Sequence, residues 1–596
     1  MYNEYMKRLF PIILILSFLG IHLFIMNDYG FTWDFHHHFF AGGWFLGITP
    51  ETLEPKPLPY LLPDPREAVK LPYGPLVQII PTVSWIVFYK TLHMLPPDSA
   101  YHLPIVLSGI MGILILYLFI KEAFGWMEGI VAATFLFLTP RFFSDLHNDM
   151  KDVPSASVFA LNMWLLFRLV KYQRVKDLIL ASLGFMLAFN TKVNAIFIPI
   201  IFVFYLSIIF IQSQFNSYRK IFINFKNTPR RRAVSGKNFE DRFPSFIRIP
   251  LQLLTNLIRT ISISIDRLLR AADREIFSTN NSTRNEKRLK FPLLLSYFLL
   301  APLLAFLLWT LFWGDGIGQI KLMFITFGIG TNNIEVLLNN TIYLSGVNVP
   351  WYYAPWYLVI TTPIPILIFF ILGSMYCLYL FTIKKHTASL LLLLWCFLPL
   401  ARYLSPKTGV LDGIRHFEEV VFPIAAFAAI ACVTIARYII KTRRGSLKIR
   451  QLFITVVAIS ILISLTLPII EYHPFQITYF NELVGGIRGA YGKYDLDYWG
   501  SSQKYAILWV NANIPKGAVV NIVMAGNVAG TYLREDLIPS LNSTDFLQSD
   551  YVVVLNRQSF FNRYVAAYPI GEYVRTHTPI YTVTNQGIPL VWVYKN

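Results

Sequence analysis

Eleven runs of apolar residues, separated by short polar segments, constrain this chain more than any other feature of its sequence. A helix needs about 20 apolar residues to cross a bilayer, so runs of this kind predict membrane spans. They lie near residues 9–26, 103–120, 129–140, 153–170, 178–191, 194–212, 293–313, 356–383, 388–404, 419–440 and 452–470. Charged residues make up only 14% of the 596 positions, against about 25% in soluble domains. The chain is therefore predicted to be a polytopic α-helical membrane protein with about eleven spans.

The positions of the basic residues predict which loops face the cytoplasm. Lys7 and Arg8 precede the first run, and residues 216–290 hold seventeen Lys or Arg against six Asp or Glu, which is +11 of the net +18. Basic loops stay on the cytoplasmic side, where the lipids are anionic. Apolar residues at helical spacing between 254 and 269 predict a basic amphipathic helix on the inner leaflet. The charge thus indicates membrane lipids as partners, and no nucleic acid.

One more apolar run, residues 75–95, tests this topology. If it crossed the membrane, the basic stretches 171–176 and 216–290 would lie outside. Its prolines and its central Gln78 instead favour a broken helix along the membrane surface. The N-terminus then faces the cytoplasm, and the outer segments are residues 27–102, 141–152, 314–355, 402–418 and the tail from residue 471.

The tail is a different kind of sequence. A helical stretch at 501–513 is followed by β-like runs at 519–524, 551–555 and 590–594. This mixture predicts a small extracytoplasmic α/β domain of residues 471–596, after a transmembrane domain of residues 1–470.

Several kinds of chemistry lose support because their motifs are absent. Cys377, Cys396 and Cys432 all lie in apolar runs without the spacing of disulfides or metal ligands. The sequence contains no Walker loop, no G-x-S-x-G and no H-E-x-x-H. ATP-driven, serine-hydrolase and redox functions are therefore disfavoured.

Two acidic clusters in the predicted outer loops could carry chemistry. Asp34 precedes three consecutive histidines, 36–38, and a carboxylate at a membrane face can act as a general base. The alternatives are a solvated loop residue or a metal site shared with the histidines. Asp149 and Asp152 lie near Lys151 at the start of a span, and if the helix extends backward their spacing puts both on one face. The alternative for Asp152 is a helix N-cap.

Two further cations lie at predicted outer boundaries. Lys192 separates two apolar runs and could hold a phosphate, or its side chain could simply extend to the membrane surface. Arg415 follows Asp412 and offers a bidentate fork for phosphate, or it could pair with Glu418 or Glu419 at helical spacing.

Several stretches together resemble those of a known class of enzymes. They are Asp34 with its histidines and Gly42-Gly43-Trp44, Lys151-Asp152-Val153-Pro154, Trp351-Tyr352-Tyr353-Ala354-Pro355-Trp356, Thr361-Thr362-Pro363, Asp412-Gly413-Ile414-Arg415-His416, His473-Pro474-Phe475, Tyr479-Phe480-Asn481 and Asp497-Tyr498-Trp499-Gly500. With them the chain resembles the GT-C class of integral-membrane glycosyltransferases, which contains the protein O-mannosyltransferases and the lipid A aminoarabinose transferases. The first-loop motif of that class usually has a second acid, and Phe35 stands in its place here.

The resemblance implies a GT-C-like fold with interfacial helices in the first outer loop, and a reaction at the outer face of the membrane. The donor would be a polyprenyl-phosphate sugar, and the acceptor a hydroxyl of a lipid, glycan or protein. Asp34 would deprotonate that hydroxyl, and Asp152, or else Asp149, would orient Asp34 or the acceptor. Lys151, Lys192 and Arg415 would neutralise the leaving phosphate.

Other candidates for substrate contact follow from the same resemblance. Tyr352 and Tyr353 would stack on the sugar or line the lipid groove, and His37, His38 and His416 lie in the matching stretches. No metal and no other cofactor is expected, with a divalent cation as the alternative. The compact form favours a bacterial plasma (inner) membrane.

Two other functions compete with this hypothesis. A transporter or flippase for a lipid-linked saccharide would place ionisable residues at mid-membrane depth, whereas most of them here lie at boundaries. A non-catalytic scaffold would leave the clustering of charged residues on one face unexplained.

Overall fold

The computed structural model describes residues 2–48, 73–227, 290–309, 313–329, 331–441, 446–540, 546–563 and 569–596. In these residues nine helices or stacked helix pairs are long and apolar enough to cross a membrane. They contain α1 (Tyr2–Ile25), α5 (Pro97–Ala123), α8 (Asp152–Tyr172), α10 (Phe197–Asn227), α12 (Phe291–Leu295) with α13 (Tyr297–Leu308), α16 (Ile364–Thr382), α17 (Thr387–Ala401), α18 (Val421–Lys441) and α19 (Leu447–Glu471). The predicted polytopic helical membrane part is confirmed.

The predicted count of about eleven spans differs from this result at two places. α6 (Trp126–Phe137) and α7 (Pro140–Asn148) are bent by 65° at the break between them, and they make a tenth span only if they are counted as one. The run at 178–191 forms α9 (Val175–Phe189), which at 15 residues is short for a span and packs against α8 and α13. Leu178, Phe185 and Phe189 are buried in this packing, whereas Ile179 and Leu180 are exposed. Hydropathy alone does not separate the two groups.

Helix α18 lies at the centre of the helical body and α19 at its edge. In their most apolar stretches, 83% of the residues of α18 are buried, but only 11% of those of α19. α18 packs against α16, α6 and α17, whereas exposed side chains such as Leu452, Phe453 and Ile470 follow α19 along its length. Apolar side chains exposed in this way are suited to lipid contact.

The apolar run predicted at 356–383 contains two helices, of which α16 alone is long enough to span. α15 (Tyr353–Thr361) ends before Pro363, and α16 begins after it. Proline cannot donate the backbone hydrogen bond that would continue α15. The side chain of Asn481 donates to the carbonyls of Val359 (2.7 Å) and Thr362 (2.8 Å), so the broken end of α15 is satisfied from a distant segment.

The first outer loop contains short helices that do not span. α2 (Phe35–Phe45) packs against α4 (Leu76–Ser84), which continues into a π-helical turn, η4 (Trp85–Thr91). Together Leu76–Thr91 form an apolar helix that is too short to count among the membrane spans. α4 lies so close to α2 that a Cβ on Gly42 would meet the carbonyl oxygen of Gln78 at 2.2 Å.

The tail forms the predicted α/β unit. Its five strands have the order β4-β3-β5-β7-β6, with β3 parallel to β4 and β5, and β7 antiparallel to β5 and β6. Helix α21 packs on β6 and β7, and α22 packs on β3. The bounds are β3 (Val519–Val523), β4 (Ile538–Ser540), β5 (Tyr551–Leu555), β6 (Tyr581–Asn585), β7 (Ile588–Lys595), α21 (Gln503–Asn513), α22 (Gly526–Gly530) and α23 (Ile570–Thr576).

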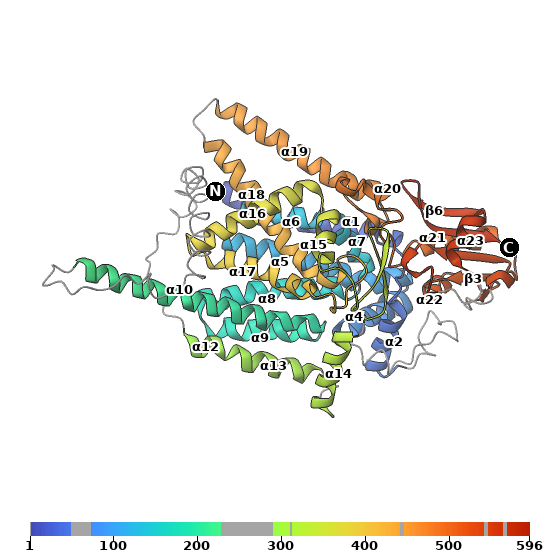
Figure 1. The fold of residues 1–596 in the computed structure, drawn as a ribbon, viewed down its shortest axis with the longest axis horizontal. Coiled ribbons are helices and arrows are strands. Elements are labelled where there is room, and N and C mark those ends of the chain that lie inside the picture. Colours follow the sequence, from blue (N-terminus) through green and yellow to red (C-terminus); the bar gives the residue numbers. More distant parts are fainter. Residues whose placement is uncertain are drawn as a thin grey trace.

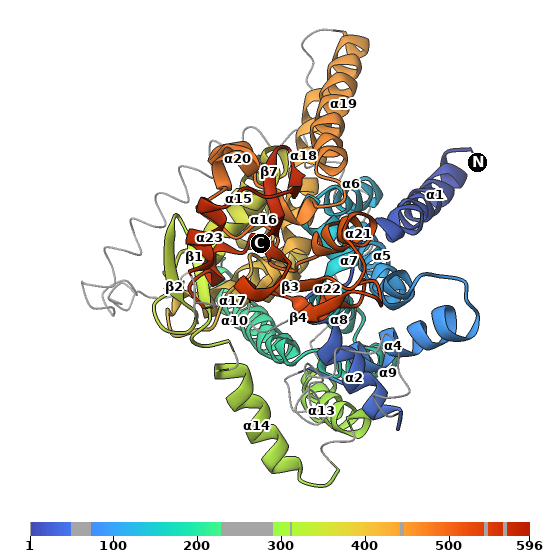
Figure 2. The same ribbon diagram turned by 90° about the vertical axis from the view of Figure 1, so that its right-hand side faces the viewer.

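The sheet lies at one end of the helical body, and the N-terminus lies at the other (Figure 1). The view onto the sheet shows it in front of the helix ends, with α14 (Gly316–Ile329) projecting from the body (Figure 2). The described residues also include a hairpin of β1 (Glu335–Leu338) and β2 (Thr341–Leu344), helix α20 (Gly486–Ala490) and several short 3-10 turns. The predicted amphipathic helix at 254–269 falls outside the described residues.

Candidate active site

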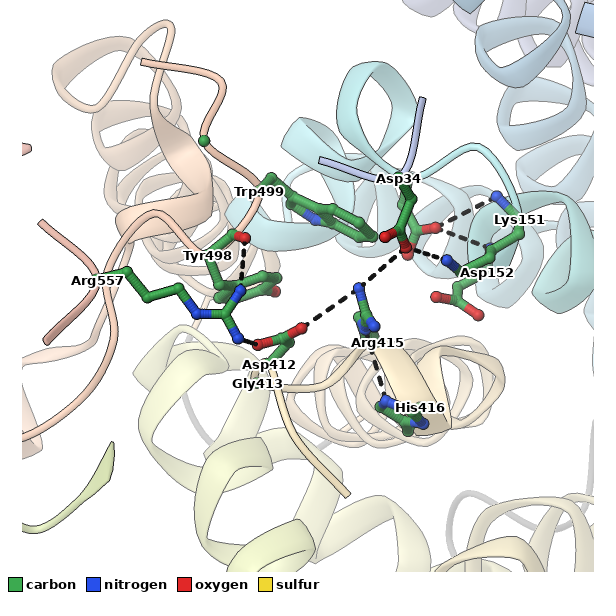
Figure 3. Close-up of polar contacts among 12 residues, drawn as sticks. Asp34, Lys151, Asp152, Asp412, Gly413, Arg415, His416, Tyr498, Trp499 and Arg557 are labelled. Atoms are coloured by element: carbon green, nitrogen blue, oxygen red, sulfur yellow. Dashed lines mark hydrogen bonds and ion pairs between the residues drawn. The ribbon is translucent and has the colours of Figure 1, made fainter. Parts of the chain in front are cut away.

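Six segments that are far apart in sequence meet beneath the C-terminal sheet. They are the start of α2, the junction of α7 and α8, the loop before the 3-10 turn η5 (Val193–Ile196), the turn η10 (Arg415–Val420) with the loop before it, residues 497–499, and Arg557. Their charged side chains form a connected set around Asp34 (Figure 3). The structure therefore brings together most of the charged residues singled out from the sequence.

Asp34 lies between two cations. Its Oδ2 accepts a hydrogen bond from Lys151 Nζ and lies 3.5 Å from Arg415 Nη1. Burial favours the neutral carboxyl, but the charges of Lys151 and Arg415 outweigh it and hold the pKa of Asp34 below its ordinary value. Asp34 keeps 27% of its side-chain surface exposed, whereas Lys151 keeps 3%. The carboxylate is thus ionised and remains within reach of a ligand.

Aromatic rings surround the two cations. Lys151 Nζ lies 4.8 Å from the ring centre of Tyr73 and 5.8 Å from that of Trp499, and Arg415 lies 4.8 Å from Trp499. Burial opposes the charge of Lys151, but Asp34 more than compensates and raises the pKa of the amine above its ordinary value. Both cations are therefore charged in a pocket with a low local dielectric, where their effect on a ligand is large.

Asp149 and Asp152 have different partners. Asp149 Oδ1 accepts the backbone N–H groups of Asp152 (2.9 Å) and Lys151 (3.3 Å), and so it caps the start of α8. Asp152 forms a buried ion pair with Lys192. The backbone of Lys192 bridges to Tyr73 in antiparallel fashion, which fixes that amine beside α8.

A row of alternating charges continues from Asp34 toward the C-terminal sheet. Arg415 Nη1 lies 3.3 Å from Asp412 Oδ2, and Asp412 Oδ1 accepts a hydrogen bond of 2.6 Å from Arg557 Nη2. With Lys151 at its other end, the row holds three cations and two carboxylates. Its net charge of about +1 suits an anionic ligand.

A cavity of about 240 Å³ opens beside this row. Asp34, Asp412 and Arg415 line it from the membrane part of the chain. The C-terminal α/β region adds further walls, and the full lining is Trp33, Asp34, Ile334, Leu411, Asp412, Arg415, Tyr498, Arg557, Phe560 and Arg563. The cavity therefore lies between the two parts of the molecule.

The remaining predicted residues lie around this core with other partners. His38 is buried and packs edge-on to Tyr73, and burial lowers its pKa well below the ordinary value. His37 is exposed on α2. His416 lies beside Arg415, and its Nε2 is 3.5 Å from Arg415 Nε. The hydroxyl of Tyr353 accepts the backbone N–H of Gly413 (3.1 Å).

Tyr352 is half-buried and packs edge-on to Trp351. Neither it nor Tyr353 lines the cavity. A role for either tyrosine in stacking on sugar stays a prediction.

Tyr498 and Trp499 of the C-terminal region are singled out from the sequence, but Arg557, Phe560 and Arg563, which line the cavity, are not. Arg557 follows β5, and ligands in α/β sheets commonly bind beyond the carboxyl ends of parallel strands, so the position was a usable signal. Phe560 and Arg563 carry no comparable signal. In the described part of the chain, no group of three or more His, Cys, Asp or Glu side chains is arranged to hold a metal ion.

Residues 81–222 match the family model of the dolichyl-phosphate-mannose-protein mannosyltransferases. This match confirms the resemblance to integral-membrane glycosyltransferases in the part of the chain that holds Lys151, Asp152 and Lys192. No curated protein matches the chain.

One similar solved structure is the archaeal oligosaccharyltransferase AglB from Archaeoglobus fulgidus, in complex with an inhibitory peptide and a dolichol-phosphate. Its sequence is 13% identical, the TM-score is 0.42, and the match covers 91% of this chain and 69% of AglB. Another is ArnT from Cupriavidus metallidurans, bound to undecaprenyl phosphate. Its sequence is 12% identical, the TM-score is 0.43, and the match covers 98% of this chain and 97% of ArnT. Both are distant likenesses.

Proposed function

We propose that this protein is a glycosyltransferase that moves a sugar from a polyprenyl-phosphate donor to an acceptor hydroxyl at the outer face of the membrane. The observation that carries the proposal is the position of Asp34, an ionised and partly exposed carboxylate held between Lys151 and Arg415 at the wall of a cavity. A carboxylate beside two cations suits a reaction that removes a proton from one substrate and expels a phosphate from the other.

The donor phosphate is assigned to the cations of the site. The name of the matched family includes a dolichyl-phosphate sugar, and Arg415 lines the cavity with its guanidinium between two carboxylates. A phosphate that binds Arg415 and Lys151 draws them away from Asp34. Because those two charges hold the pKa of Asp34 low, their withdrawal makes the carboxylate a stronger base when the donor is bound.

The proposed chemical step is a single displacement at the anomeric carbon of the donor sugar. The acceptor oxygen attacks the anomeric carbon while its proton passes to Asp34. The bond between that carbon and the phosphate oxygen breaks, and polyprenyl phosphate leaves with the electron pair. Lys151 and Arg415 neutralise the charge that develops on the leaving oxygen. Asp152, paired with Lys192, positions the start of α8 that carries Lys151.

The distribution of charge supports a location of the site at the outer face of the membrane. Lys121, Lys171 and Lys441 lie in the last turns of α5, α8 and α18. α8 begins at Asp152, beside the site, so Lys171 lies at the end of this helix away from the site. By the positive-inside rule that end faces the cytoplasm. The site, the sheet and the C-terminus are then extracytoplasmic, in a plasma (inner) membrane.

The test is turnover by purified protein in nanodiscs that contain a radiolabelled polyprenyl-phosphate hexose. Wild-type protein should release polyprenyl phosphate, and Asp34→Asn should lower the rate by about 10²–10⁴-fold, the usual contribution of a general base. Glu482→Gln, an exposed carboxylate away from the site, is the matched control and should keep the wild-type rate.

Two results would contradict the proposal. Full activity of Asp34→Asn would remove Asp34 as the base. Tight lipid binding by wild-type protein without release, across a panel of sugars and cell extracts, would favour the flippase or scaffold alternative.

A further inference from the structure

We propose that the C-terminal region supplies an anion-binding subsite for the acceptor, formed by Arg557 and Arg563, and that the acceptor is a saccharide carrying a phosphate or carboxylate. The inference rests on the proposed function and adds to it the class of acceptor. It starts from the two arginines of the cavity wall that the donor chemistry above does not use.

Arg557 is a buried cation that faces the cavity. Its side chain is 4% exposed, Nη2 donates to Asp412, and Nη1 donates to the carbonyl of Tyr498 (3.1 Å). Its guanidinium stacks on Phe560 at 3.8 Å and lies 5.1 Å from Trp33. Among the described residues, its Nε is buried and has no hydrogen-bond partner. A buried donor without a partner costs free energy, so this nitrogen indicates a place for a ligand acceptor atom.

Arg563 is the accessible cation of the pair. Its side chain is 45% exposed and lies 5.1 Å from the ring of Phe560, while Nη1 lies 3.1 Å from Glu335 on β1. An exposed ion pair of this kind contributes little to stability. A ligand anion can therefore replace Glu335 as the partner of Arg563 at small cost.

The order of the row sets this subsite apart from the cations assigned to the donor phosphate. Asp34 contacts Arg415, Arg415 contacts Asp412, and Asp412 contacts Arg557. Arg415 and Lys151 flank Asp34 and are assigned to the donor phosphate. The anion held by Arg557 and Arg563 is thus separated from the donor phosphate by Asp412, and it belongs to the second substrate.

The volume and lining of the cavity indicate a small, polar group. Its volume of about 240 Å³ is below the roughly 300–1,000 Å³ of pockets that enclose whole drug-sized ligands. It therefore suits the terminal residue of an acceptor. Tyr498, whose buried hydroxyl has no partner among the described residues, offers a hydrogen bond to a sugar hydroxyl. The guanidinium group of arginine matches the geometry of both carboxylate and phosphate, so the group that this subsite binds is an oxyanion of either kind.

The experiment measures binding by equilibrium dialysis of full-length protein in nanodiscs preloaded with polyprenyl phosphate. The probes are radiolabelled methyl glucoside 6-phosphate, methyl glucuronoside and neutral methyl glucoside. We expect one or both anionic probes to bind about tenfold more tightly than the neutral one, as hydrogen bonds to charged groups allow. Which anionic probe binds more tightly distinguishes phosphate from carboxylate.

Two variants act in opposite directions on this preference. Arg563→Gln should weaken binding of the anionic probe by about tenfold and leave methyl glucoside unchanged. Glu335→Gln removes the competing carboxylate and should tighten binding of the anionic probe by about two- to fivefold. Arg575→Gln, an exposed arginine on α23, is the control and should change nothing. Both test residues are partly exposed, so the fold does not depend on them as it depends on the buried Arg557.

Affinity for polyprenyl phosphate is measured separately in each variant, so that the two proposals fail in different ways. Equal binding of charged and neutral probes to protein that still binds and turns over the donor would overturn the acceptor subsite alone. If wild-type protein does not turn over the polyprenyl-phosphate donor at all, the proposed function is wrong. Unchanged preference in both Arg563→Gln and Glu335→Gln would show that the anion binds elsewhere.

Discussion

At the scale of single residues, Asp149 and Asp152 lie in one acidic cluster but make different contacts. Their spacing predicts a shared helix face, and both are buried near the start of α8. Asp149 nevertheless accepts two backbone N–H groups, while Asp152 pairs with Lys192. The cap that the sequence suggested for Asp152 is thus formed by Asp149. This contact holds Lys151 at the end of the helix, where its amine meets Asp34.

The cap predicts different effects for two substitutions of Asp149. Asparagine keeps the side-chain oxygen that accepts the N–H groups, whereas alanine leaves them unpaired. Asp149→Ala should therefore lower the free energy of unfolding by about 1–2 kcal/mol and reduce turnover, and Asp149→Asn should stay close to wild type in both. Thermal unfolding in detergent and the turnover assay measure the two effects. A large loss of turnover in Asp149→Asn at unchanged stability would instead point to a direct catalytic role for the charge.

At the scale of elements, the site depends on close backbone contact between the first outer loop and the loop before η5. The N–H of Gly74 donates to the carbonyl of Thr191 (3.0 Å), and Tyr73 bridges to Lys192. A Cβ on Gly74 would lie 1.9 Å from the carbonyl oxygen of Asn190, a contact with backbone that cannot be relieved by a rotamer change. Glycine at this position thus keeps Tyr73 over Lys151 and Lys192 beside Asp152.

Gly74→Ala is therefore expected to separate the two loops. Overpacking of this kind costs about 1–3 kcal/mol in stability, and turnover should fall because Lys192 moves with its loop. Gly20→Ala is the control, since a Cβ there meets nothing within 4 Å and alanine favours the helix. Thermal unfolding and turnover of both variants check this expectation. Wild-type behaviour of Gly74→Ala would show that the two loops can shift without affecting the site.

At the scale of the whole molecule, the C-terminal region closes the site by contacts with the membrane part. Arg557 pairs with Asp412, Lys504 Nζ lies 2.7 Å from Asp98, and the hydroxyl of Tyr532 accepts the N–H of Phe31 at 2.7 Å. Residues 472–499 lie between the last span and the sheet, and many of them are buried against the helices. A domain boundary at residue 471 stays a proposal, since this segment serves both parts.

The arrangement of charge also predicts the orientation of the molecule. A membrane-impermeant maleimide should label Arg575→Cys on intact cells if the C-terminal sheet and α23 are extracytoplasmic, as proposed. It should label Lys448→Cys, at the start of α19, only after the cells are permeabilised. Wild-type protein is the background control, since Cys377 and Cys396 are buried and Cys432 is partly buried. The opposite pattern of labelling would reverse the topology and place the site in the cytoplasm.

The sequence by itself determined the features that depend on local composition. Apolar runs of sufficient length predict most of the spans, and short β-like runs predict strands in the tail. Polar clusters at the boundaries of apolar runs predict Asp34, Lys151 and Asp152 as site residues. Each of these follows from the hydropathy or charge of neighbouring residues, which does not depend on how the helices pack.

Only the tertiary structure decided which of these residues meet, and where the apolar runs break. Arg415 reaches Asp34 across 381 positions of sequence, and Arg557 reaches Asp412 across 145. At the break before α16, the free backbone carbonyls accept hydrogen bonds from Asn481, which lies more than a hundred residues away in sequence. Ion pairs and capping hydrogen bonds depend on distances in space of a few ångströms, and those distances are set by the packing of whole helices against one another.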